Sequence, residues 1–157
     1  MANRTFNQFG GTLERKVVKL FAKITYAAGA PTLVLSEVLN SGTSPITINP
    51  SQGFESLVAG STGRFTLVLG ANNGNVPTYD PYVRLLNVSA SQVVSAGLAT
   101  GTLVTVLVIT DNVNGASGNP SLVLQPIVIG GGGPQENVPA DGTTLLLEIT
   151  LSNTTAY

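Results

Sequence analysis

Carboxylates, lysines and hydroxyls are the groups with which this chain could do chemistry, because it contains no histidine and no cysteine. A Ser-His-Asp triad, a Cys-His nucleophile and a thiolate zinc site therefore cannot be built from it. Two carboxylates could serve a glycoside hydrolase, for example Glu55 with Asp80, or Asp111 with Glu148. Such pairs arise by chance among eight acids, and the absence of tryptophan leaves few aromatic platforms for a sugar. We expect no catalytic residues and no enzyme activity.

Two glycine-containing segments resemble ligand-binding loops only in part. Residues 111–115 (DNVNG) suggest a calcium loop, but Val113 stands where an oxygen ligand belongs and no glutamate closes the loop. Residues 130–134 (GGGGP) have the glycine content of a phosphate cradle, but no lysine occurs after Lys23. The sequence therefore predicts an ordinary Asn-Gly turn and a flexible loop, with no metal and no cofactor.

The composition predicts an all-β protein whose surface is poor in charge. Charged residues make up 10% of the chain, whereas soluble domains average about 25%. Eighteen glycines and nine prolines supply turns, and the many Val, Leu, Ile and Thr residues favour strands. With a mean hydropathy of +0.31, such a surface indicates cover by other subunits, the alternative being a poorly soluble monomer. We therefore expect a homo-oligomer.

Positive charge is concentrated at the N-terminus. The first 23 residues hold five of the seven Lys and Arg residues and one acid, a net charge of +4, against −5 for the remainder. A basic segment on an acidic body usually docks onto something acidic. Nucleic acid is not the expected partner, because Arg64 and Arg84 are the only later cations. A membrane is not expected either, because every apolar stretch is far shorter than the ~20 residues of a spanning helix. No secretory signal is visible, which predicts synthesis in a cytoplasm.

Two-residue alternation is the main organising signal. It places Phe65, Leu67 and Leu69 on one face of a strand, and the same pattern recurs near the C-terminus at Leu145, Leu147, Ile149 and Leu151. Clusters of Gly, Asn, Pro and Ser separate about eight or nine strands at the spacing of sandwiches and barrels. The predicted architecture is a jelly-roll-like or related β-sandwich over residues 12–157, preceded by a short basic arm, residues 1–11.

The sequence predicts where two of the strands lie in the sheets. Residues 102–110 are apolar on both faces, which predicts a central strand deep in the core, where Asp in place of Val106 or Leu107 would be far more damaging than Thr144→Asp. Residues 121–129 contain Pro126, which cannot donate to a ladder, so this strand is predicted at an edge or with a bulge.

Residues 12–26 fit two structures. As a helix, they would place Leu13, Val17, Leu20, Phe21 and Ile24 on one stripe. As a strand, they would turn Val18, Leu20, Ala22, Ile24 and Tyr26 inward, with Lys19 and Lys23 outward. The β-branched residues favour the strand. Either structure puts the lysines on one exposed face.

Several blocks of the chain resemble small structural proteins of tailed bacteriophages, notably aquatic phages that infect cyanobacteria. They are residues 4–14 (RTFNQFGGTLE), 17–22 (VVKLFA), 29–33 (GAPTL), 63–69 (GRFTLVL) and 80–88 (DPYVRLLNV). Together they cover less than half of the chain. The resemblance lies in ordered blocks and carries no catalytic signature.

The resemblance implies a virion protein, a cement or decoration protein on the outer capsid surface that binds the major capsid protein. It also implies an all-β fold and self-association, often as trimers. The alternative is a tail or fibre-base component, or a host-surface binding module. The residues expected to contact the capsid are those of the basic segment and its aromatic anchors: Arg4, Phe6, Phe9, Arg15, Lys16, Lys19 and Lys23. The alternative for this segment is a frayed terminus followed by a solvated strand face.

Overall fold

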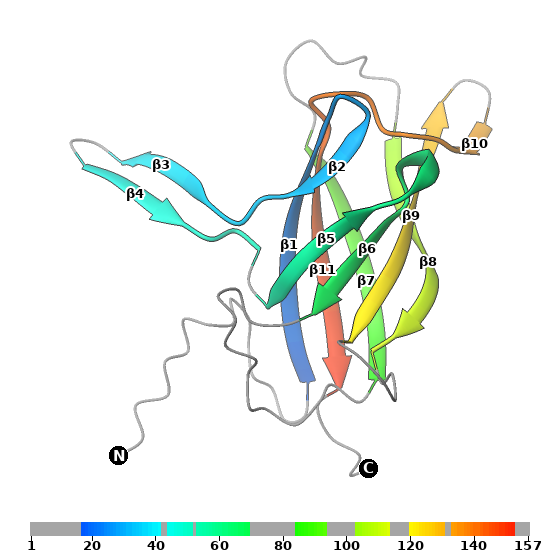
Figure 1. The fold of residues 1–157 in the computed structure, drawn as a ribbon, viewed down its shortest axis with the longest axis horizontal. Coiled ribbons are helices and arrows are strands. Elements are labelled where there is room, and N and C mark those ends of the chain that lie inside the picture. Colours follow the sequence, from blue (N-terminus) through cyan, green and yellow to red (C-terminus); the bar gives the residue numbers. More distant parts are fainter. Residues whose placement is uncertain are drawn as a thin grey trace.

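The computed structural model describes residues 17–41, 44–51, 53–69, 84–93, 103–113, 120–130 and 133–152. These residues form eleven strands and one short 3₁₀ turn, with no α-helix among them (Figure 1). Nine strands make two antiparallel sheets, and the other two make a separate hairpin. The predicted all-β sandwich is therefore confirmed. Its strands outnumber the eight or nine expected, because short edge strands and the hairpin add to the main ones.

The first sheet has the strand order β2 (Ala30–Leu33), β1 (Val17–Ala27), β11 (Thr144–Ser152) and β7 (Arg84–Val93). Alternate residues of β1 and β11 point into the core, as the sequence predicted: Val18, Leu20, Ala22, Ile24, Tyr26, Leu145, Leu147, Ile149 and Leu151 are all buried. Residues 17–26 are thus a strand rather than a helix, while residues 1–16 lie outside the described part of the chain.

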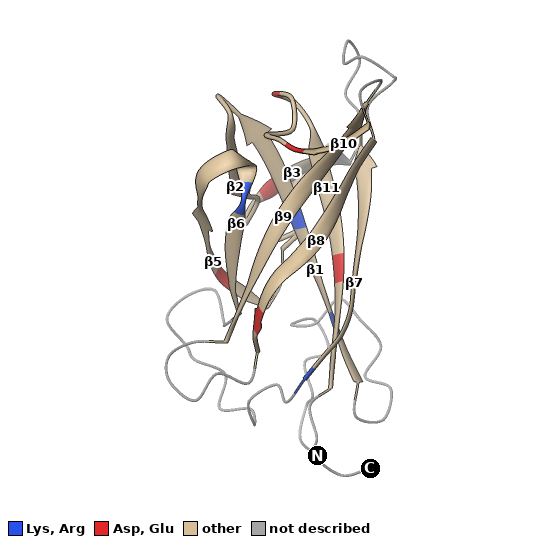
Figure 2. Ribbon diagram, turned by 90° about the vertical axis from the view of Figure 1, so that its right-hand side faces the viewer, with Lys and Arg blue, Asp and Glu red and all other residues tan. Residues whose placement is uncertain are grey.

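The second sheet packs its inner face against the first (Figure 2). Its order is β10 (Gly133–Glu136), β9 (Ser121–Gly130), β6 (Phe65–Leu69) and β5 (Phe54–Ala59), with β8 (Leu103–Asn112) also paired to β9. Its buried side chains complete one core: Phe54, Phe65, Leu67, Leu69, Val104, Leu122 and Leu124. The predicted inward alternation of β6 is confirmed.

The prediction that residues 102–110 form a central strand is wrong. Within the described sheet, β8 pairs with β9 alone, and its other side faces β7 of the first sheet. There the backbone N–H of Val104 donates to Gln92 Oε1 at 2.9 Å. Val104 is buried, whereas Leu103 is 58% exposed and Leu107 48% exposed. A strand that is apolar on both faces therefore buries Val104 and leaves Leu103 and Leu107 in contact with solvent.

The edge position predicted for residues 121–129 is also wrong. β9 lies between β8 on one side and both β6 and β10 on the other. Pro126 is tolerated because it falls between the segment paired to β6, which ends at Leu124, and the segment paired to β10, which begins at Ile127. On the side of β9 that faces β6, the backbone N–H of Leu69 donates to the Pro120 carbonyl. The backbone polar groups of a strand point to alternate sides, so the nitrogen of Pro126, six residues later, points to the same side and into the gap. The described ladder does have a register shift, but it lies on β8 between Val108 and Thr110.

A tight turn fills this gap. Gln125 is buried, and its Nε2 donates to the carbonyl of Thr62 at 3.0 Å while its Oε1 accepts from Arg64 Nε at 3.0 Å. Gly63, between them, has a φ of 73°. The Tyr26 hydroxyl donates to the Gly63 carbonyl at 3.5 Å, and burial raises the pKa of Tyr26 well above its usual range. The turn thus joins the two sheets.

The position of β8 leads to a prediction about two of its residues. We expect Val104→Asp to abolish folding, because it buries an unpaired charge. We expect Leu107→Asp to retain a folded chain, because the Leu107 side chain already contacts water. Circular dichroism and thermal melting of both variants check this. Equal loss of structure in the two would contradict the edge assignment.

Candidate interaction surface

The structure describes two of the seven residues expected to contact a partner. Lys19 and Lys23 lie on the outer face of the first sheet, as predicted for a strand. Lys19 Nζ lies 2.8 Å from Glu148 Oε1, and Lys23 Nζ lies 2.6 Å from Glu37 Oε1. Each lysine is therefore paired with an acid of its own chain. The other five lie outside the described residues: Arg4, Phe6, Phe9, Arg15 and Lys16. A docking role for the basic segment stays a prediction.

A hairpin of β3 (Glu37–Ser41) and β4 (Ser44–Ile48), here called the arm, projects from the sandwich (Figure 1). Its register places Leu39 opposite Ile46, and Ile48 opposite Glu37. Because side chains alternate along strands, Leu39, Ile46 and Ile48 share one side of the hairpin, the apolar arm face. Their exposed fractions lie between 37% and 52%. The arm thus presents large apolar side chains to solvent.

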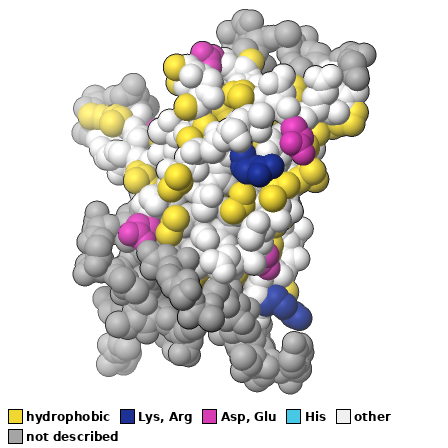
Figure 3. All heavy atoms as spheres, turned by 45° about the vertical axis from the view of Figure 1, so that its right-hand side comes forward, with side chains coloured by type: hydrophobic (Ala, Val, Ile, Leu, Met, Phe, Trp, Pro, Cys, Tyr) yellow, Lys and Arg dark blue, Asp and Glu magenta, His cyan; other side chains and the backbone are white. Residues whose placement is uncertain are grey.

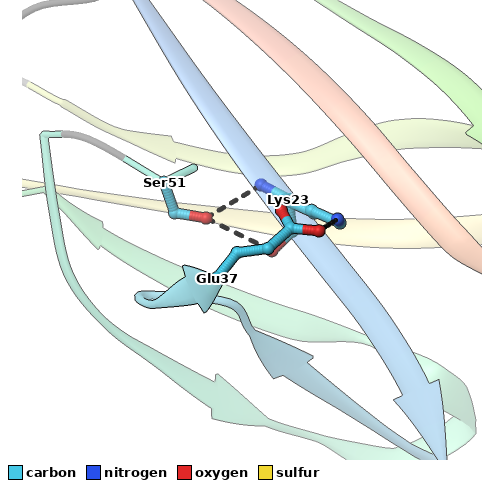
Figure 4. Close-up of polar contacts among 3 residues, drawn as sticks. All are labelled: Lys23, Glu37 and Ser51. Atoms are coloured by element: carbon cyan, nitrogen blue, oxygen red, sulfur yellow. Dashed lines mark hydrogen bonds and ion pairs between the residues drawn. The ribbon is translucent and has the colours of Figure 1, made fainter. Parts of the chain in front are cut away.

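Polar contacts fix the base of the arm to β1 (Figure 4). The Ser51 hydroxyl accepts from the Lys23 backbone N–H at 2.9 Å and donates to the Lys23 carbonyl at 3.2 Å. The Ser51 backbone N–H donates to Asn49 Oδ1 at 2.9 Å. Glu37 is the first residue of β3, and its Oε1 accepts a hydrogen bond from the Lys23 ammonium. Ser51 is fully buried. The residues at the two ends of the arm, Glu37 and Ser51, are therefore both fixed to Lys23 of β1.

These two anchors should differ in their contribution to stability. Ser51→Ala should lower the free energy of unfolding by about 1–3 kcal/mol, because it leaves a backbone donor of Lys23 without its buried acceptor. Glu37→Gln should cost at most about 1 kcal/mol, because the ion pair is partly exposed and screened. Urea unfolding of the two variants measures the difference. A larger loss for Glu37→Gln would contradict this ranking.

A second apolar surface lies along β8. Leu103, Leu107, Val108 and Ile109 are exposed, and we call these four residues the β8 strip. Leu103 and Leu107 alternate with the buried Val104 and so point outward from the second sheet. Figure 3 shows hydrophobic side chains on the arm and, separately, on the body of the molecule. Exposed apolar patches of this kind mark interaction sites in soluble proteins.

The described acidic residues lie at scattered places along the ribbon (Figure 2). Glu148 lies on the first sheet with Lys19, whereas Asp111 lies on β8 and accepts from the Val113 backbone N–H at 3.0 Å. Asp80 lies outside the described residues. No group of three or more acidic residues placed to hold a metal ion occurs in the part of the chain that the structure describes.

The glycine-rich segment joins two paired strands. Gly130 of β9 pairs with Gly133 of β10, so these residues belong to a hairpin; residues 131 and 132 lie outside the described structure. No helix among the described residues has the length and hydropathy needed to cross a membrane.

Comparison of the chain with models of protein families, with curated proteins and with solved structures finds no match.

The arm and the β8 strip are the residues that sequence reasoning missed. The signal for the arm was present: a turn-forming segment at residues 40–44 separates two short stretches with apolar residues. The sequence could not predict that this hairpin projects from the sandwich, because a projecting hairpin and a hairpin within a sheet have the same local sequence pattern.

Proposed function

We propose that this protein is a non-enzymatic structural component of a bacteriophage particle, a cement or decoration protein that binds the major capsid protein on the outside of the head. It joins neighbouring capsid subunits after the shell has assembled, and it self-associates, with a trimer favoured by the sequence resemblance. The observation that carries the proposal is the exposure of large apolar side chains on the arm and the β8 strip of a sandwich poor in charge.

The physical basis is the burial of these surfaces in an assembly. Apolar area removed from water contributes about 25 cal/mol per Å² before the cost of association. A single arm offers few such side chains, so one contact is weak. Copies placed on a symmetric lattice act together, however, and their combined binding is far stronger than that of one copy. Rigid β-strands suit this role because little order must be gained on binding.

Electron microscopy of particles with and without the protein tests the position. Particles of the phage that encodes it would be compared with particles assembled without it, and purified protein would then be added back. We expect density on the icosahedral shell that is lost and then restored. Density on the tail or the fibre base would overturn the capsid role in favour of a tail component.

The basic N-terminal segment is expected to make binding sensitive to salt. Deleting residues 2–9 and replacing Lys16 by glutamine should weaken binding to heads and flatten its salt dependence. The reason is that exposed charges are screened strongly at 1 M salt, where the Debye length is about 3 Å. Lys19 and Lys23 are kept, because each is paired with an acid of its own chain. Co-sedimentation with heads at increasing salt measures the effect.

A single substitution serves as a matched control for this experiment. Lys19→Gln alone should change binding little, because this lysine is already paired with Glu148. If the truncated and neutralised protein binds heads with unchanged affinity and salt response, the segment is not the docking element.

A further inference from the structure

The arm joins the sandwich through two short connectors, residues 34–36 and 49–51. Neither connector belongs to a sheet, and Leu35 in the first is 40% exposed. Among the described elements, each arm strand packs extensively only against the other. The connectors can therefore act as a hinge, because few contacts oppose a rotation of the whole hairpin about them.

One residue of β1, Lys23, holds the body side of both connectors. β2 pairs with β1 only over residues 24–27, and beyond them the Val34 backbone N–H donates to the Lys23 carbonyl at 2.9 Å. A regular antiparallel rung would return the Lys23 N–H to the Val34 carbonyl. The Ser51 hydroxyl accepts that N–H instead, at 2.9 Å. The first connector thus leaves the sheet, and the second reaches it, at the same residue.

The side chain of the same lysine reaches past the connectors to the arm itself (Figure 4). Its ammonium lies 2.6 Å from Oε1 of Glu37, which begins β3. No other hydrogen bond or ion pair joins the described residues of the two arm strands to the rest of the described chain. The lysine side chain is 24% exposed and the glutamate side chain 32% exposed. A single ion pair that water can reach therefore spans the hinge.

We propose that the Lys23–Glu37 ion pair is a latch that holds the arm in one orientation, and that the arm rotates about its connectors when the pair opens. The contacts to Ser51 use backbone atoms of Lys23, so they stay in place when the pair opens. Because a partly exposed pair contributes modestly, both the held and the released arm are populated. The latch lies within one chain and does not depend on a capsid role.

Distances between spin labels on the arm and on the body test the latch. The chain has no cysteine, so labels can be attached at Thr47→Cys on β4 and Ser91→Cys on β7, two exposed positions. In the labelled parent, pulsed electron paramagnetic resonance should give one dominant distance. Lys23→Met removes the ammonium and keeps the backbone contacts to Ser51. In this variant the ratio of the dominant distance to all others should fall roughly two- to fivefold.

Lys19→Met is the matched control. Lys19 lies on the same outer face of β1 and pairs with Glu148 of β11, within the first sheet. Its loss should leave the distribution of distances as in the parent. Circular dichroism verifies that every variant retains its β-structure. A distribution in Lys23→Met that matches the parent, or an equal change in Lys19→Met, would overturn the proposal.

Charge reversal separates an electrostatic latch from packing of the lysine stem. Lys23→Glu should release the arm, and the further change Glu37→Lys should restore the dominant distance, because the pair is rebuilt with its charges exchanged. At 1 M salt, where the Debye length is about 3 Å, the parent should shift toward the distribution of Lys23→Met, which itself should not respond. No recovery on adding Glu37→Lys, or an equal salt response in parent and Lys23→Met, would show that charge attraction does not hold the arm.

Discussion

Leu147→Ala is expected to lower the free energy of unfolding by about 2–5 kcal/mol, the usual range for a buried leucine. Leu147 is 1% exposed in the middle of β11. Its neighbours across the sheet are Ala22 on β1 and Ala90 on β7. Because both neighbours are alanines, neither can fill the cavity, and we expect a value in the upper half of that range. Denaturant unfolding at equilibrium measures it.

The adjacent residue provides a control for the same change. Leu146 points to the outer face of the sheet and is 42% exposed. Leu146→Ala should change the free energy of unfolding by no more than about 0.5 kcal/mol, as for most surface substitutions. Similar losses at the two positions would mean that β11 does not present alternate faces to core and solvent.

Gly63→Ala is expected to cost about 2–5 kcal/mol, because it combines two effects. The residue has a φ of 73°, which costs an L-residue roughly 1–2 kcal/mol. A Cβ at this position would lie 3.0 Å from Val138 Cα and 3.3 Å from Pro126 Cγ. Overpacking of this kind adds about 1–3 kcal/mol. Backbone at Val138 and a proline ring have little freedom to move away.

Gly29→Ala separates the two effects. Gly29 has a φ of 74°, but no heavy atom lies within 4 Å of the position its Cβ would take. The substitution should therefore carry only the conformational cost. Thermal unfolding of the two variants gives the packing contribution at Gly63 as their difference. Equal losses would contradict the close approach of Val138 to the turn.

Strands with one polar and one apolar face were predictable from the sequence. In β1 and β11, polar residues alternate with apolar ones, and this pattern identified the buried side of each. β8 has no such contrast, since Leu103, Val104 and Leu107 are all apolar. Which of them is exposed depends on which face of β8 is turned toward the core, and that is a property of the whole fold. The gap that accepts Pro126 depends likewise on where β6 begins, at Phe65, and where β10 ends, at Glu136.

The candidate surface was less predictable than the fold. Lys19 and Lys23 were placed on the correct face, but their partners, Glu148 and Glu37, come from distant parts of the sequence. Local patterns carry no information on such pairs. Alternation also could not identify the arm as a projection, because Leu39 and Ile46 have the spacing of core residues.

The pairing of β1 with β11 has a consequence for synthesis of the protein. Val17, at the start of the described chain, lies opposite Ser152 at its end, and β11 is the strand that joins β1 to β7. During translation the first sheet cannot close until residues 144–152 have left the ribosome, so β1 lacks its main hydrogen-bonding neighbour until that point. Such non-local pairing slows folding and prolongs exposure to aggregation. A chain that terminates before β11 loses the strand that joins β1 to β7 and with it the centre of this sheet.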